Sequence, residues 1–157
     1  MTEILFVCTG NIFRSMIAEK ALRHAAGNDS PYRFSSAGTE ANPQKMVDIV
    51  RDGLLARGID PTGHKQRKLT PALFNAADLV IAIGFDHVAF LKEHHSSEVV
   101  LFNEVAHGCR EAILDTWEAV PDYAENSKDR NAHIHQVLDH ICESAAPLLA
   151  NLPTYLK

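Results

Sequence analysis

Residues 4–15 read Ile4-Leu5-Phe6-Val7-Cys8-Thr9-Gly10-Asn11-Ile12-Phe13-Arg14-Ser15, and this stretch carries the strongest signal in the chain. Its first four residues have the apolar, β-rich composition of a buried strand. The strand pattern stops at Cys8, and Gly10 and Asn11 tolerate the backbone angles of a tight loop. Apolar residues recur at helical spacing from Ser15 onward. The stretch therefore predicts a strand, a loop and a helix in succession.

The loop between this strand and helix is a predicted phosphate-binding site. Backbone N–H groups that point into such a loop form an anion-binding nest. The N-terminus of the following helix adds its positive end at the same point. We therefore expect the loop to bind phosphate oxygens through Thr9, Gly10, Asn11, Ile12, Phe13, Arg14 and Ser15.

Cys8 and Arg14 are the predicted catalytic pair. An arginine and a helix N-terminus favour the thiolate, which is the nucleophilic form of cysteine. A thiolate can take a phosphoryl group as a covalent intermediate, and a guanidinium can bind two of its oxygens. A cysteine that ends a buried strand is otherwise often an inert apolar residue, but the surrounding loop favours the nucleophile. The pair predicts phosphate-ester hydrolysis with no cofactor and no metal.

The chain as a whole resembles the low-molecular-weight protein tyrosine phosphatase family. The family signature is a Cys-x5-Arg-Ser loop with Gly-Asn inside it near the N-terminus, and residues 8–15 match it. The resemblance implies a phosphotyrosine protein or aryl phosphate as substrate, and inorganic phosphate as product and inhibitor. Further blocks follow in the family's order: Ser36-Ala37-Gly38-Thr39, Arg57-Gly58-Ile59-Asp60 with Gly63-His64, Ala77-Asp78-Leu79-Val80 and Val120-Pro121-Asp122-Tyr123.

The resemblance implies a general acid in an Asp-Pro-Tyr segment late in the chain. Pro121-Asp122-Tyr123 is the nearest equivalent, so Asp122 is the predicted acid and Tyr123 a predicted wall of the substrate pocket. The proline that usually follows the acid is missing. Nearby alternatives for the acid are Asp115, Glu118 and Glu125.

The substrate pocket is expected to be unusual. Ile12 is the other predicted wall, because a branched apolar side chain suits the face of a phenyl ring. In the family an aromatic residue follows the Ser-Ala-Gly-Thr block and lines the phenyl slot, but residues 40–43 hold none. We therefore expect Tyr123 to be the only ring and the pocket to be open on one side.

A supporting network for the loop is also implied by the resemblance. Asn11, Ser36 and His64 match the family residues that hold the phosphate loop in shape through hydrogen bonds. Ser15, at the start of the predicted helix, has a hydroxyl that can donate to a thiolate or cap the helix.

Two alternatives to the tyrosine phosphatase remain open. Thioredoxin-coupled arsenate reductases share the signature loop, but they relay a disulfide through closely spaced cysteines, whereas Cys109 and Cys142 lie 33 residues apart. A catalytically weak phosphate-binding regulator would also fit a pocket that has fewer aromatic side chains than is usual in the family. Among phosphatases, the family's arginine phosphatases typically have threonine where Ile12 stands, so phosphotyrosine is favoured over phosphoarginine.

Phe13 stands at a position that protects many relatives from irreversible oxidation. At this position they carry a second cysteine, which forms a reversible disulfide with the nucleophile. We therefore predict that peroxide inactivates Cys8 without an intraloop disulfide, and that this inactivation is harder to reverse.

Composition indicates one small domain over residues 1–157. With 157 residues and 46% hydrophobic side chains, the chain can bury a core of its own. The net charge of −5 argues against nucleic acid as the main partner. Three cysteines without a disulfide pattern suggest a reducing, cytoplasmic location, and no apolar run is long enough to cross a membrane. The nine histidines show no zinc-site spacing.

The order of predicted elements indicates an α/β fold. Strand patterns at 4–7, 34–36, 79–83 and 99–101 alternate with helix patterns at 15–26, 43–57, 86–94 and 129–152. Such alternation predicts a four-stranded parallel sheet with helices on both faces, a three-layer sandwich of the phosphotyrosine phosphatase I-like type. Ligands in such sheets bind beyond the carboxyl ends of the strands, which is where Cys8 lies.

Overall fold

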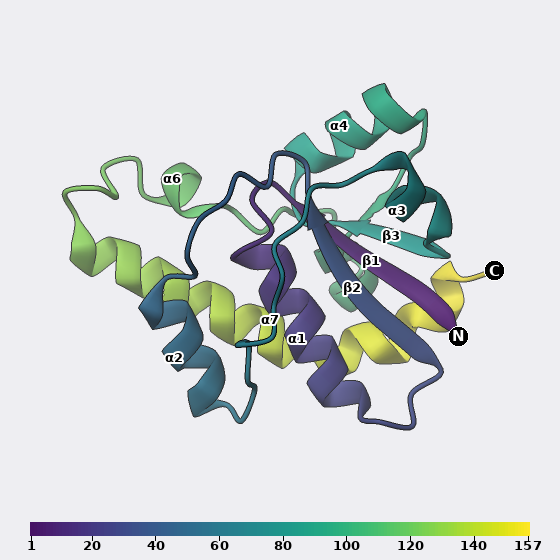
Figure 1. The fold of residues 1–157 in the computed structure, drawn as a ribbon, viewed down its shortest axis with the longest axis horizontal. Coiled ribbons are helices and arrows are strands. Elements are labelled where there is room, and N and C mark those ends of the chain that lie inside the picture. Colours follow the sequence, from purple (N-terminus) through teal and green to yellow (C-terminus); the bar gives the residue numbers. More distant parts are fainter.

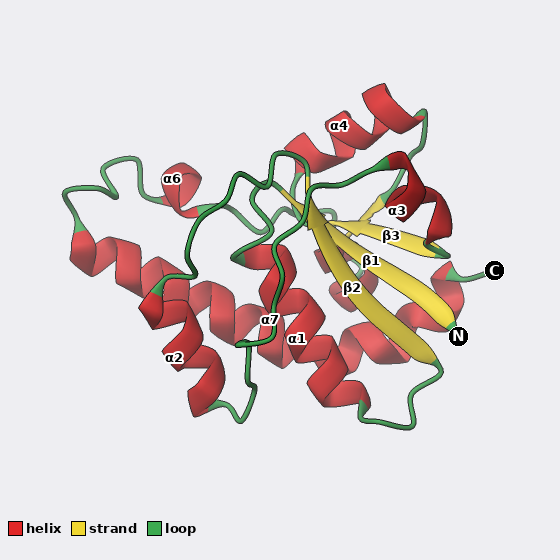
Figure 2. Cartoon of the chain, in the orientation of Figure 1, coloured by secondary structure: helices red, strands yellow, loops and turns green.

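Four parallel strands form the centre of the molecule (Figure 2). The computed structural model describes residues 1–157. The strands lie in the order β2-β1-β3-β4, and every neighbouring pair is parallel. Their bounds are β1 (Thr2–Cys8), β2 (Tyr32–Gly38), β3 (Leu79–Ala82) and β4 (Val100–Leu101). The predicted four-stranded parallel sheet is confirmed.

Seven helices connect or follow the strands. The longest, α7, has 29 residues and closes the chain. No helix combines the length and the apolar character needed to cross a lipid bilayer. The helices are α1 (Arg14–Ala26), α2 (Asp48–Ala56), α3 (Pro71–Ala76), α4 (Phe85–His95), α5 (Phe102–His107), α6 (Thr116–Ala119) and α7 (Ser127–Tyr155).

Alternate residues of β1 point to opposite faces of the sheet and so divide the core in two. Ile4 and Phe6 belong to the larger apolar cluster, which is completed by side chains of α1, α2, α5 and α7. Leu5 and Val7 belong to a smaller cluster, against which α3 and α4 pack. Figure 1 shows α3 and α4 on one side of the sheet and α1, α2 and α7 on the other. The predicted three layers are confirmed.

The helix predicted from residue 43 begins only at Asp48. Residues 41–47 are irregular because their backbone bonds to the side chain of Gln66 instead of to a helical turn. The short helices α3, α5 and α6 were not predicted, since four to six residues are too few to show a helical period.

The carboxyl end of the sheet is where the loop after β1 meets the end of β2. Cys8 lies opposite Gly38 in the register of the two strands. A Cβ atom on Gly38 would lie 2.4 Å from the Thr9 carbonyl oxygen and 3.0 Å from the Asn11 nitrogen. Only glycine therefore allows β2 to approach the loop this closely.

Candidate active site

Cys8 is buried at the end of β1, and its sulfur receives polar contacts from the loop that follows. The Asn11 backbone N–H donates to the Cys8 Sγ at 3.3 Å. The Ser15 Oγ lies 2.8 Å from the same sulfur and accepts a hydrogen bond from the Asn11 side-chain amide at 3.1 Å. This bond leaves the Ser15 hydroxyl hydrogen free to donate to the sulfur. Two hydrogen-bond donors are therefore directed at one sulfur.

Asn11 holds the loop in place. Its φ angle of 56° lies in the left-handed region, and its side chain is fully buried. The side-chain amide also donates to the Ser36 Oγ at 2.8 Å, and the carbonyl Oδ1 accepts from the Arg67 backbone N–H at 2.9 Å. The backbone carbonyl accepts from the His64 Nε2 at 2.7 Å. The structure thus brings together the four residues proposed to support the loop, since Ser15 belongs to the same network.

Three further residues support the loop and were not predicted from the sequence. Arg67 contributes the backbone N–H described above, and Gln66 donates from Nε2 to the Gly10 carbonyl at 2.5 Å. Glu19 accepts from the Ser36 hydroxyl at 2.8 Å. Their only sequence signal is position: two follow His64 closely, and Glu19 lies one helical turn after Ser15.

His87, on α4, reaches the same loop from the other side of the sheet. The Gly84 N–H donates to the His87 Nδ1 at 2.9 Å, so the neutral ring carries its proton on Nε2. That nitrogen lies 2.9 Å from the Thr9 Oγ1 and donates to it. Burial and the positive charge of Arg14 lower the pKa of His87 to about 4, so the ring is neutral at pH 7. A role for His87 was not predicted from the sequence.

Arg14 is buried at the start of α1 and is held by the segment that leads into α6. Its Nη1 donates to the Ile113 carbonyl at 2.8 Å, and its Nη2 donates to the Asp115 Oδ2 at 3.2 Å. The Glu118 carboxylate lies 3.9 Å from Nη1. These contacts fix the orientation of the guanidinium, and they come from residues about a hundred positions further along the chain than Arg14.

A cavity of about 490 Å³ opens in front of Cys8 and Arg14. This volume is within the range of small-ligand sites. Its other lining residues come from the loop, from residues 44–50, from the α6 region and from α7: Gly10, Ile12, Phe13, Gln44, Val47, Val50, Asp115, Thr116, Trp117, Tyr123, Arg130, Asn131 and Ile134.

Both predicted substrate walls, Ile12 and Tyr123, line this cavity. Two further aromatic residues line it, namely Phe13 from the loop and Trp117, which is 58% exposed. The sequence-based expectation that Tyr123 is the only ring is therefore wrong. The indole of Trp117 comes from α6 and not from residues 40–43, where the family has an aromatic residue.

The structure does not bring Asp122 into this cavity. Asp122 is exposed and accepts a hydrogen bond from the Asn126 side chain at 3.3 Å. Asp115, which was named as an alternative, does line the cavity. A signal for it was present in Asp115-Thr116-Trp117, because an acid two residues before an aromatic ring repeats the spacing of Asp-Pro-Tyr.

The two other cysteines lie outside the cavity of Cys8. Cys109 is exposed after α5, and Cys142 lies half-buried on α7 beside a separate small cavity. Burial raises the pKa of Cys142, which disfavours its thiolate. Neither placement supports the disulfide relay of an arsenate reductase. No group of three or more His, Cys, Asp or Glu side chains is arranged to hold a metal ion.

Comparison with known proteins agrees with this geometry. The family model described as low molecular weight phosphotyrosine protein phosphatase matches residues 3–155. The low molecular weight protein-tyrosine-phosphatase Etp of Escherichia coli (strain K12) is 28% identical over 94% of this chain and 95% of its own. A protein-arginine-phosphatase of Bacillus subtilis (strain 168) is 28% identical over 81% of this chain and 87% of its own. The crystal structure of a YwlE mutant from Bacillus subtilis superposes with a TM-score of 0.81 at 25% identity, covering 98% of this chain and 99% of that one.

Proposed function

Because the chain belongs to the low molecular weight phosphotyrosine protein phosphatase family, we propose that it hydrolyses phosphotyrosine and related aryl phosphate esters through a cysteinyl-phosphate intermediate. One observation carries the proposal. Cys8, Arg14 and Asp115 line a single cavity that is also lined by three aromatic residues, Phe13, Trp117 and Tyr123. A nucleophile, a phosphate-binding cation, a carboxylate and an apolar slot are the parts that this reaction needs.

In the first step the Cys8 thiolate attacks phosphorus, and the bond between phosphorus and the phenolic oxygen breaks. The loop amides and the Arg14 guanidinium bind the phosphate oxygens, on which negative charge is concentrated. The leaving phenolate takes a proton from a carboxylic acid. The products of this step are the free phenol and a phosphoryl group bound to the Cys8 sulfur.

In the second step water attacks the phosphocysteine and gives a proton to the same carboxylate. The sulfur leaves as a thiolate and inorganic phosphate is released. The Ser15 hydroxyl and the Asn11 N–H, which contact the sulfur at 2.8 and 3.3 Å, stabilise this leaving thiolate. One carboxylate thus acts as acid and then as base.

We assign this carboxylate to Asp115 in place of Asp122. Asp115 lines the cavity and contacts Arg14, whereas Asp122 points to solvent and to Asn126. Thr116 stands where the family has proline after the acid. The Asp115 Oδ1 accepts from the Thr116 N–H at 2.7 Å, and this bond supplies part of the local order that a proline ring would otherwise provide.

Phosphotyrosine is the substrate class that the apolar side of the cavity favours. Ile12, Trp117 and Tyr123 present one branched chain and two rings, which suit the faces of a phenyl group. The similarity to a protein-arginine-phosphatase makes phosphoarginine the substrate to compare with it. Since all three cysteines are free, we also place this activity in a reducing cytoplasm.

The test is hydrolysis of p-nitrophenyl phosphate in the presence of a chelator, followed by a panel of phosphotyrosine, phosphoserine and phosphoarginine peptides at one pH. We expect metal-independent turnover, a preference for phosphotyrosine, and a loss of about 10³-fold or more in Cys8→Ser. Preference for phosphoarginine would overturn the substrate assignment. Turnover in Cys8→Ser equal to that of the parent would overturn the mechanism.

A further inference from the structure

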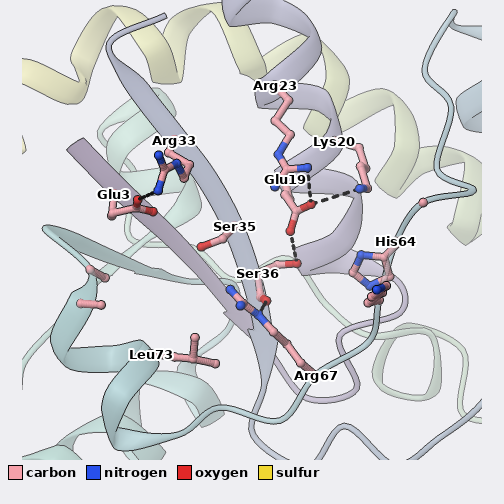
Figure 3. A pocket seen from close by; sticks show the side chains of 14 residues that line it. Glu3, Glu19, Lys20, Arg23, Arg33, Ser35, Ser36, His64, Arg67 and Leu73 are labelled. Atoms are coloured by element: carbon pink, nitrogen blue, oxygen red, sulfur yellow. Dashed lines mark hydrogen bonds and ion pairs between the residues drawn. The ribbon is translucent and has the colours of Figure 1, made fainter. Parts of the chain in front are cut away.

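A second cavity, of about 710 Å³, lies along the outer edge of β2 and shares no lining residue with the cavity of Cys8 (Figure 3). Glu3 and Glu19 are its only carboxylates. The protein as a whole carries a net charge of −5, yet this cavity has a formal charge of +3 with His64 neutral. Five cationic side chains line it: Lys20, Arg23, Arg33, Lys65 and Arg67.

Two of the arginines have a structural role, because they hydrogen-bond to the exposed edge of β2. The Arg23 Nε donates to the Phe34 carbonyl at 2.9 Å, and the Arg67 Nε donates to the Ser36 carbonyl at 2.8 Å. These bonds occupy carbonyl oxygens that an added strand would need. The edge of β2 is therefore a poor site for an extended peptide that binds by strand addition.

The remaining positive charge has no such explanation. Glu19 forms ion pairs with Lys20 at 3.2 Å and with Arg23 at 3.3 Å, so two positive charges face its one negative charge. Glu3 pairs with Arg33 at 2.7 Å, as Figure 3 shows. The terminal amino groups of Arg67 and the ammonium group of Lys65 make no hydrogen bond or ion pair within the protein. The cavity thus holds cationic donors that are not used by the fold.

We propose that this cavity binds a small, phosphate-bearing polyanion. Guanidinium forks match the geometry of phosphate oxygens, and several cations around one space favour a ligand with more than one negative charge. The volume is in the range of small-molecule sites. Apolar lining is confined to Leu73 and Ala76 on α3 and to Ala77, which follows it, so the ligand offers at most one apolar edge.

The proposed ligand would sit against the residues that hold the phosphate loop. Ser36, His64 and Arg67 all line this cavity, and each hydrogen-bonds directly to Asn11. Glu19 joins the same network through Ser36. An anion that binds here therefore contacts the supports of the catalytic loop without entering the cavity of Cys8.

The test is titration with inorganic tripolyphosphate at low ionic strength, followed by amide chemical shifts in ¹⁵N-labelled protein. Amides of Ser35 and Lys65 report the β2-edge cavity, and those of Gly10 and Ile12 report the phosphate loop. We expect the first group to shift in a saturable way. The readout is binding, so the result is independent of whether the protein hydrolyses phosphotyrosine.

Two matched double variants decide the outcome. Arg33→Gln with Lys65→Gln removes two charges from the cavity, and Lys92→Gln with Lys128→Gln removes two charges from exposed helical surfaces elsewhere. We expect the cavity variant to bind tripolyphosphate at least about tenfold more weakly, because charge-assisted contacts are lost, and the control to match the parent. Shifts confined to Gly10 and Ile12, or equal affinities in the two double variants, would overturn the proposal.

Discussion

Asp115 and Arg14 are bonded to each other in the catalytic cavity, with the Asp115 Oδ2 accepting from the Arg14 Nη2 at 3.2 Å. The two residues are 101 positions apart in the chain. Their contact places the proposed acid beside the cation that is proposed to bind phosphate, in the cavity that Cys8 also lines. Asp122 has no such contact.

Asp115→Asn is expected to lower kcat on a phosphotyrosine peptide by about 100-fold, the usual contribution of a general acid. The loss should be smaller on p-nitrophenyl phosphate, because p-nitrophenolate leaves without much help from a proton. Steady-state kinetics on both substrates measures this difference. Asp122→Asn is the matched control and should behave like the parent. The reverse result for the two variants would return the acid role to Asp122.

Trp117→Ala is expected to lower kcat/KM on phosphotyrosine peptides about fivefold, equivalent to roughly 1 kcal/mol of lost aromatic contact. The affinity for inorganic phosphate should not change, since phosphate does not reach the rim. Inhibition constants for phosphate, measured beside the kinetics, separate the two effects. An equal loss in both quantities would mean that the ring supports the loop rather than the substrate.

Asn11→Ala should destabilise the protein by about 2–4 kcal/mol, because a buried network loses three side-chain hydrogen bonds and leaves polar partners unpaired. The left-handed backbone at this position adds strain for alanine. Urea unfolding measures the change. Asn28→Ala, in the exposed turn between α1 and β2, serves as the control. A destabilisation below 1 kcal/mol, on the scale of one typical hydrogen bond, would contradict the role of Asn11 as the hub of the loop.

His87 should make the protein less stable in acid. Burial, and then the charge of Arg14, lower its pKa from 6.5 to about 4 in the folded state, so the unfolded chain binds a proton first as the pH falls. Its stabilising contribution is therefore complete above pH 6.5 and is lost as the pH falls toward 4. We expect about 2 kcal/mol less stability at pH 5 than at pH 7 from this residue.

Unfolding free energies of the parent and of His87→Gln at the two pH values test this expectation. The variant should lose most of the difference in unfolding free energy between pH 5 and pH 7. A smaller dependence on pH should remain, because burial also lowers the pKa of His64, His133 and His140. If the unfolding free energy of the variant changed with pH as much as that of the parent, His87 would not titrate between pH 5 and pH 7.

Peroxide should inactivate the enzyme without forming a disulfide inside the loop. Phe13 occupies the position of the missing cysteine, and its ring packs against the edge of His133 at 6.4 Å between centroids. Mass spectrometry of the oxidised protein should show oxygen added to Cys8, with poor recovery by thiols at high peroxide. Phe13→Cys should recover better. A bridge from Cys8 to Cys109 or Cys142 would contradict this prediction.

The sequence predicted the elements that rest on local patterns. The parallel sheet and the four principal helices could be predicted because the hydrophobic periods of strands and helices appear in successive residues. The loop residues from Cys8 to Ser15 were readable for the same reason, since they lie together in the chain. The start of α2 was misplaced because the backbone before Asp48 bonds to the distant Gln66 side chain.

By itself, the sequence determined the fold class and the chemistry of the phosphate loop, in which a cysteine, an arginine and an asparagine are neighbours on one turn. Only the tertiary structure decided which carboxylate and which rings join them. Asp115 and Trp117 line the cavity and His87 bonds to Thr9 of the loop, and all three come from segments far along the chain. The spacing of Asp115-Thr116-Trp117 gives a local signal for two of these residues, but Pro121-Asp122-Tyr123 gives a similar one. Only the hydrogen bonds and packing of the folded chain place Asp115 in the cavity and leave Asp122 exposed.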